Sequence, residues 1–141
     1  MKTLAFLLCL ILLLALGALL YIRLAPSDPP RWHADPDTIP DPSTPNFARL
    51  TTEIPLPRAE VADRIDAQAR LEGAQKLAGD TGLTTWIARS RLMRFPDYVT
   101  IRLEETTRGT RVTALSRARF GHGDMGVNAA RLRRWIDTLT P

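Results

Sequence analysis

The sequence SRARFGHGDMGVN, residues 116–128, gathers side chains of the kinds that carry out catalysis. Ser116, His122 and Asp124 are the three residue types of a hydrolase triad, in which histidine activates serine and aspartate orients histidine. Strand alternation, however, directs Ser116 toward the core, whereas His122 falls in a glycine-rich loop. The sequence also has no Gly-x-Ser-x-Gly nucleophile elbow. We therefore expect no catalytic residue here, and a hydrolase-like enzyme using this corner is the alternative.

The same stretch also fits an anion-binding site. Arg117 and Arg119 carry planar guanidinium groups that match phosphate and carboxylate, and the helix expected after Asp124 offers free N–H groups. The alternative is a structural network in which Asp124 accepts hydrogen bonds from these arginines and caps the helix, while Asn128 ties the helix to the corner. Asp124 favours the structural network, because its carboxylate already occupies the place at the helix N-terminus where an anion would bind. The residues assigned to the corner are Asp97, Ser116, Arg117, Arg119, Asp124, Asn128 and Arg131.

Hydrophobic periodicity predicts the elements that position this corner. Alternation predicts a strand over residues 48–54 and two strands on either side of the turn at 79–82. It also predicts a hairpin over residues 97–120. Helical spacing predicts two helices. The buried stripe of the first is Val61, Ala62, Ile65 and Ala69; the apolar side of the second is Met125, Ala129, Leu132, Ile136 and Leu139, with Trp135 at its edge. Short turns make neighbouring strands antiparallel. The predicted fold is α+β: a transmembrane helix, then a small domain with one antiparallel sheet of four or five strands and two helices packed on one face.

Alternation along the strands also predicts a basic face. If Trp86 and Val112 point at the helices, their chain neighbours point to the opposite side of the sheet. Six arginines then share that side: Arg89, Arg91, Arg102, Arg111, Arg117 and Arg119. One interpretation is a solvated outer face, which antiparallel sheets commonly have. The other is a surface that binds an anionic partner.

Residues 4–22 form an uncharged apolar run. As a helix it spans roughly 28 Å, close to the ~30 Å hydrocarbon core of a bilayer. The alternative is a cleaved signal peptide, with the small residues around Gly17 as the cleavage site. We favour an uncleaved anchor, because the apolar run continues past Gly17 as far as Arg23. The short tail ahead of the run favours export of the domain.

The chain is therefore expected to have three parts. Residues 1–24 are the transmembrane anchor, or a signal peptide. Residues 25–46 contain seven prolines and four aspartates. Because proline fixes φ and lacks an N–H donor, this linker is predicted to be an extended spacer that lifts the domain off the bilayer, with Trp32 at the headgroup level. Residues 47–141 are the α+β domain.

Several function classes are disfavoured by what the sequence contains. Its two histidines, His33 and His122, have no metal-ligand spacing, and its glycines follow no phosphate-binding pattern. We expect neither a metal nor a cofactor. Nucleic acid is not an expected partner either, because the basic face lacks interleaved exposed aromatic residues.

The run from Arg94-Phe95-Pro96-Asp97 through Ser116-Arg117-Ala118-Arg119 to Gly121–Asn128 and Arg131 resembles the uncharacterised family called domain of unknown function 1499. Two departures stand out: Ala118 replaces the usual second serine, and Phe47 follows Asn46 where many members have cysteine. The resemblance covers roughly residues 46–141. It implies a small, often membrane-anchored or exported domain with no established activity.

These observations predict a single-pass protein of the bacterial inner membrane whose C-terminal domain lies in the periplasm. The domain is expected to be non-catalytic and to bind an anionic ligand. The expected partner is the membrane itself, through the anchor, together with an anionic lipid headgroup, an envelope polymer or another membrane protein.

Overall fold

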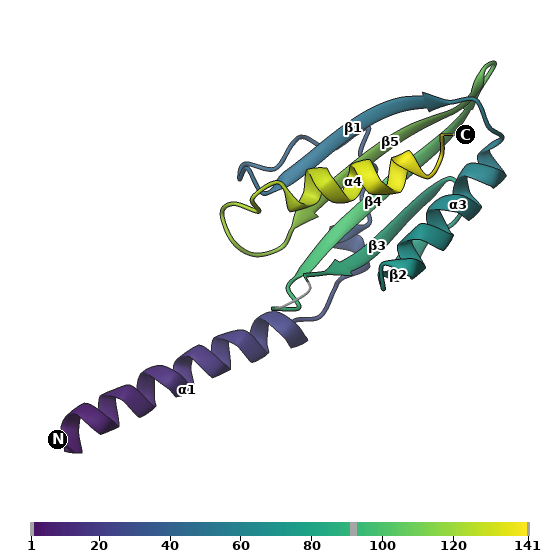
Figure 1. Ribbon diagram of the computed structural model, residues 1–141. Helices are drawn as coiled ribbons and strands as arrows, with labels where there is room; N and C mark the ends of the chain where they lie inside the picture. Colours follow the sequence, from purple (N-terminus) through teal and green to yellow (C-terminus); the bar gives the residue numbers. More distant parts are fainter. Residues whose placement is uncertain (1, 91–92, 141) are drawn as a thin grey trace.

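The computed structural model describes residues 2–90 and 93–140 and confirms the predicted α+β class (Figure 1). A long N-terminal helix leads into a domain in which two helices lie across one face of a sheet. In chain order the elements are α1 (Lys2–Leu24), α2 (Pro29–Trp32), β1 (Phe47–Ile54), α3 (Arg58–Leu71), β2 (Gln75–Gly79), β3 (Leu83–Arg89), β4 (Pro96–Thr106), β5 (Gly109–Ala118) and α4 (Val127–Asp137).

Within the described residues, five strands form one antiparallel sheet in the order β1-β5-β4-β3-β2. The hairpin of β4 and β5 turns where Thr106 pairs with Gly109. Glycine is needed at position 109, because φ is +140° and a Cβ there would lie 2.1 Å from the Ile54 carbonyl oxygen. The strand β1 returns alongside β5, and its alanine at position 48 is paired with Ser116.

The helices α3 and α4 bury their apolar stripes against the sheet. Val61 and Ile65 of α3 and Leu132 of α4 pack with Val99, Ile101, Val112 and Ala114 in one core. Two predictions for the last helix were wrong. Trp135 is fully buried and meets Trp86 edge-on at 6.4 Å, instead of lying at the edge of the stripe. Met125 is fully exposed, because it precedes the first turn of α4.

The opposite face of the sheet is not open to solvent. Residues 25–46, hereafter the covering segment, cross it instead of forming an extended spacer, so that prediction was wrong. Trp32, only 7% exposed, stacks on Tyr98 with a ring distance of 3.9 Å and an interplanar angle of 8°. His33 Nδ1 lies 2.9 Å from Thr85 Oγ1. Proline is tolerated in the first turn of the short helix α2, and the aromatic and acidic side chains of the segment find partners on the sheet.

The helix α1 is exposed along almost its whole length and extends away from the domain (Figure 1). Among the described residues it is the one helix long and apolar enough to cross a membrane, as expected of an anchor or a signal sequence. Its last turns contact the domain, because the ring of Tyr21 lies 6.3 Å from that of Phe120. The Nε–H of Arg23 donates to the Met93 carbonyl at 3.1 Å.

Candidate functional site

The motif residues of strands β4 and β5 and helix α4 meet in a buried polar network around Arg131. Its Nη2 donates to Asp97 Oδ2 at 2.8 Å. Its Nη1 donates to Asn128 Oδ1 at 2.9 Å and to Ser116 Oγ at 3.2 Å. The side chains of Arg131 and Asp97 are 6% and 10% exposed, so the ion pair is almost entirely removed from water. Such a pair fixes β4, β5 and α4 relative to one another.

The carboxylate of Asp124 accepts hydrogen bonds at the start of α4, as predicted, although the N-cap position belongs to Gly126 and not to Asp124. Its Oδ2 accepts hydrogen bonds from the backbone N–H and from the side-chain amide of Asn128 at 2.9 and 2.7 Å, and its Oδ1 accepts from the N–H of Gly126 at 3.0 Å. Although burial opposes the shift, these donors lower the pKa of Asp124. Because Asp124 is fully engaged here, it occupies the anion position of this helix terminus.

Asn46 belongs to the same network, and sequence reasoning did not assign it a role there. It is buried, and its carbonyl oxygen accepts from Asn128 Nδ2 at 3.0 Å. Its own Nδ2 donates to the Gly121 carbonyl at 2.7 Å. A polar residue directly ahead of an apolar strand was the available signal, because a buried amide must find partners.

The geometry at Ser116 does not form a hydrolase triad. Ser116 is 0% exposed, and its hydroxyl donates to Asn128 Oδ1 while accepting from Arg131. His122 is exposed, and within the described part of the chain no hydrogen bond joins it to Ser116 or Asp124. Burial raises the pKa of Asp97, although Arg131 partly offsets the rise.

Arg117 and Arg119 lie on the opposite face from this network, so the predicted pairing of these arginines with Asp124 was wrong. Alternation places Ser116 on the helix side and its neighbours on the side of the covering segment. Arg117 Nη2 donates to the Trp32 carbonyl at 3.1 Å, and its Cζ lies 5.0 Å from the Trp32 ring centre. Burial lowers the pKa of Arg117.

The predicted basic face exists, but the covering segment neutralises much of it. Arg102 lies 3.2 Å from Asp35, and Arg111 lies 3.1 Å from Asp37 and 2.5 Å from Glu104. The aspartates of the covering segment therefore serve as counterions for the sheet. The sequence did not reveal this pairing, because the carboxylates and the arginines are more than sixty residues apart. Arg91 lies outside the described residues.

Arg89 has a different environment, at the end of the sheet next to α1. Its Nη1 donates to the Arg23 carbonyl at 3.4 Å and to the Arg94 carbonyl at 3.2 Å. Among the ion pairs of the described residues, none involves Arg89, Arg23 or Arg94. The guanidinium groups of Arg23 and Arg89 thus lie where α1 meets the domain, and both donate to backbone carbonyls.

A groove of about 670 Å³ opens beside Arg89, between the end of β3 and the first turns of α4. Arg131 and Arg134 also line it, so three arginines from two elements surround the same space. Glu72 lines it as well, and its carboxylate accepts hydrogen bonds from Nε and Nη2 of Arg134 at 2.9 and 3.0 Å. Its apolar walls are Ala88, Val127 and Ala130. Basic side chains above small apolar ones suit an anionic group that carries a hydrophobic part.

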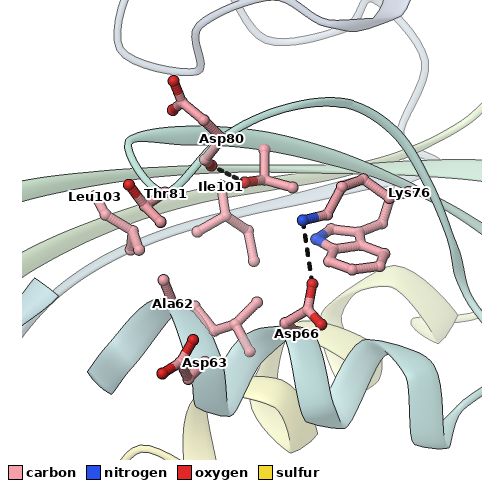
Figure 2. Close-up of a pocket in the computed structure, with 11 residues that line it drawn as sticks. Ala62, Asp63, Asp66, Lys76, Asp80, Thr81, Ile101 and Leu103 are labelled. Atoms are coloured by element: carbon pink, nitrogen blue, oxygen red, sulfur yellow. Dashed lines mark hydrogen bonds and ion pairs between the residues drawn. The ribbon is translucent and has the colours of Figure 1, made fainter. Parts of the chain in front are cut away.

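A second cavity, of about 190 Å³, lies between α3 and strands β2 to β4 (Figure 2). Its walls include Ile101 and Leu103, and Figure 2 shows Lys76 and Asp66 facing each other across one side of it. Lys76 and Asp66 form an ion pair at 3.1 Å, and Asp66 also pairs with Arg70. The charges of Lys76 and Asp66 are therefore already balanced within the protein. We therefore regard the groove as the stronger candidate.

Comparison with known proteins identifies the family but no activity. The model of the family described as "Protein of unknown function (DUF1499)" matches residues 22–139, so the chain belongs to this family. No curated protein is significantly similar to it. Among solved structures, protein MLL2253 from Mesorhizobium loti aligns with a TM-score of 0.51 at 10% identity, covering 66% of this chain and 93% of that one. Protein CV1439 from Chromobacterium violaceum has a TM-score of 0.44 at 13% identity, covering 68% and 96%. The first likeness shows the fold alone.

Proposed function

We propose that this member of the DUF1499 family is a non-catalytic, membrane-anchored domain whose groove binds anionic lipid headgroups. The observation that carries the proposal is the position of Arg89. Arg89 lines the groove, and its guanidinium donates to the backbone at the end of α1, so the groove lies close to the point where an anchored helix would leave the bilayer.

Charge supports an anionic headgroup over a neutral one. Arg134 forms an ion pair with Glu72, and Arg131 forms an ion pair with Asp97, so both positive charges are balanced. Arg89 has no carboxylate partner among the described residues, so the groove keeps a positive charge next to the headgroup layer. A hydrogen bond to a charged group contributes about 1.5–3 kcal/mol. Loss of one such bond should therefore weaken headgroup binding about tenfold or more.

We place the protein in the bacterial inner membrane, anchored by α1, with its domain in the periplasm. A non-catalytic role is supported by Ser116, whose hydroxyl is buried and engaged on both sides.

The test is lipid retention by the full-length chain. The protein is purified in a nonionic detergent, mixed with equal amounts of phosphatidylglycerol and phosphatidylcholine, and examined by native mass spectrometry. We expect phosphatidylglycerol to be retained preferentially and Arg89→Gln to reduce its retention about tenfold. Arg133→Gln is the matched control, because Arg133 is exposed on α4 and does not line the groove. Equal retention of the two lipids, or an equal loss in both variants, would refute the proposal.

A further inference from the structure

The loop between β5 and α4, residues 119–126, presents a fully exposed apolar side chain. Met125 is 100% exposed, and its backbone has a left-handed φ of 51°, which is uncommon for a residue with a side chain. Val127, directly after the loop, is 43% exposed. The start of α4 therefore presents two apolar side chains to its surroundings.

Asp124 fixes the position of Met125. On either side of the methionine, the N–H of Gly126 donates to Asp124 Oδ1 at 3.0 Å and the N–H of Val127 donates to the Asp124 carbonyl at 3.0 Å. The exposed side chain is therefore carried by a hydrogen-bonded turn ahead of α4, which holds it outward.

The first residues of the loop are attached to the end of α1. Phe120 meets Tyr21 edge-on at 6.3 Å. Arg119 lies over the Phe120 ring at 5.1 Å, and its Nη1 donates to the Pro26 carbonyl at 2.7 Å. Tyrosine near the end of an apolar helix typically lies at the membrane–water interface. If α1 is an anchor, the loop therefore begins at the level of the interface.

A second exposed methionine lies beside the same helix end. Met93, on the loop between β3 and β4, is 42% exposed, and its carbonyl accepts from Arg23. Arg94 follows it without an ion pair to any other described residue. Met93, Arg94 and Arg119 therefore lie close to the end of α1, and Met125 lies on the loop that starts at Arg119. Together they combine exposed apolar side chains with basic ones. Surfaces that lie in the interfacial layer of a bilayer have this composition.

We infer that the loop 119–126 inserts Met125 into the interfacial layer of the bilayer that holds α1. The occupant of this surface is the chain's own membrane, because Tyr21 and Phe120 connect the loop to the helix that crosses it. The anchor also keeps that membrane at a high effective concentration, so a weak apolar contact is sufficient. Met125 does not line the groove, although its neighbour Val127 does, and insertion of Met125 relies on apolar contact instead of charge.

The test is a depth measurement on the full-length chain in vesicles. Cys9, the single cysteine, is replaced by serine, and Met125→Cys is labelled with an environment-sensitive fluorophore. Thr107→Cys is the matched control, because the turn between β4 and β5 lies at the end of the sheet far from α1 (Figure 1). In vesicles of phosphatidylcholine that carry a shallow nitroxide on the acyl chain, we expect at least twofold stronger quenching at position 125 than at position 107.

Two outcomes would overturn the inference. One is equal quenching at positions 125 and 107. The other is quenching at position 125 that appears only at high ratios of protein to lipid, which would indicate contact with a second copy. Because Met125 is fully exposed, Met125→Cys should keep the melting temperature of the parent chain, so loss of folding does not obscure the result. The vesicles are neutral, so binding of an anionic headgroup in the groove cannot cause the quenching. If position 125 is quenched in phosphatidylcholine vesicles while the retention experiment shows no preference for phosphatidylglycerol, the proposed function is refuted and the inference about Met125 stands.

Discussion

Replacing Arg131 by alanine tests the view that the motif residues act mainly as a buried scaffold. The change removes hydrogen bonds to Asp97, Asn128 and Ser116 and leaves the buried Asp97 carboxylate without its counterion. Breaking such a pair from one side costs about 3–5 kcal/mol. With an unfolding slope of about 2 kcal/mol per molar urea, the transition midpoint should fall by about 2 M.

The cost of Arg131→Ala should also depend on pH. Arg131 lowers the pKa of Asp97 against the larger effect of burial, so the variant leaves burial unopposed and raises that pKa further. A carboxyl whose folded-state pKa is raised is tolerated while protonated and disfavours folding once it ionises. The variant should therefore lose the least stability near pH 4. The loss should grow as the pH rises through the folded-state pKa of Asp97.

The assay is urea unfolding of the full-length chain in a nonionic detergent, followed by tryptophan fluorescence, since Trp135 lies one turn after Arg131 on α4. Arg133→Ala is the control, because this neighbour is exposed and its loss should cost less than about 0.5 kcal/mol. A cost of Arg131→Ala below about 1 kcal/mol at pH 7, or an equal cost at pH 4 and pH 7, would refute the reasoning.

Three further predictions concern the elements around the network. Trp32→Ala should lower the free energy of unfolding by about 3–5 kcal/mol, because it removes the stack on Tyr98. Trp32→Phe should keep most of the melting temperature, and equal melting temperatures for the two variants would contradict this. Asp124→Ala should cost about 1 kcal/mol at pH 7. Because the folded-state pKa of Asp124 is lowered, the difference in unfolding free energy between parent and variant should shrink as the pH falls through that pKa. Urea titrations measure this difference, and an increase in acid would be inconsistent with capping. Gly109→Ala should cost more than about 1 kcal/mol by thermal melting, because its Cβ would overlap the Ile54 carbonyl, and unchanged melting would argue against that close approach.

The sequence was sufficient for the sheet and its helices because their side chains repeat with clear periods. Val99, Ile101 and Leu103 alternate toward the helices, and Ser116 turns inward with them, as expected. The same alternation placed Arg102 and Arg111 on the other face, and their position there is confirmed by contacts with the covering segment. What periodicity reports is which side of a strand a residue occupies.

Partners of those side chains could not be predicted, because they depend on how distant segments pack. The proline content of residues 25–46 predicted neither helix nor strand, whereas the short helix α2 lies within the segment, and it gave no sign that Trp32 stacks on Tyr98. Proximity along the chain was misleading at the corner, where Asp124 was expected to pair with Arg117. The two residues belong to opposite faces of the sheet, and Asp124 instead binds Asn128 in the next turn.

The junction of α1 and the covering segment is attached to the sheet at two points. Arg89 donates to the Arg23 carbonyl, and Arg119 donates to the Pro26 carbonyl. If α1 crosses a bilayer, a tilt of the helix would act on the sheet through these two contacts, and the orientation of the domain would depend on the thickness of the membrane.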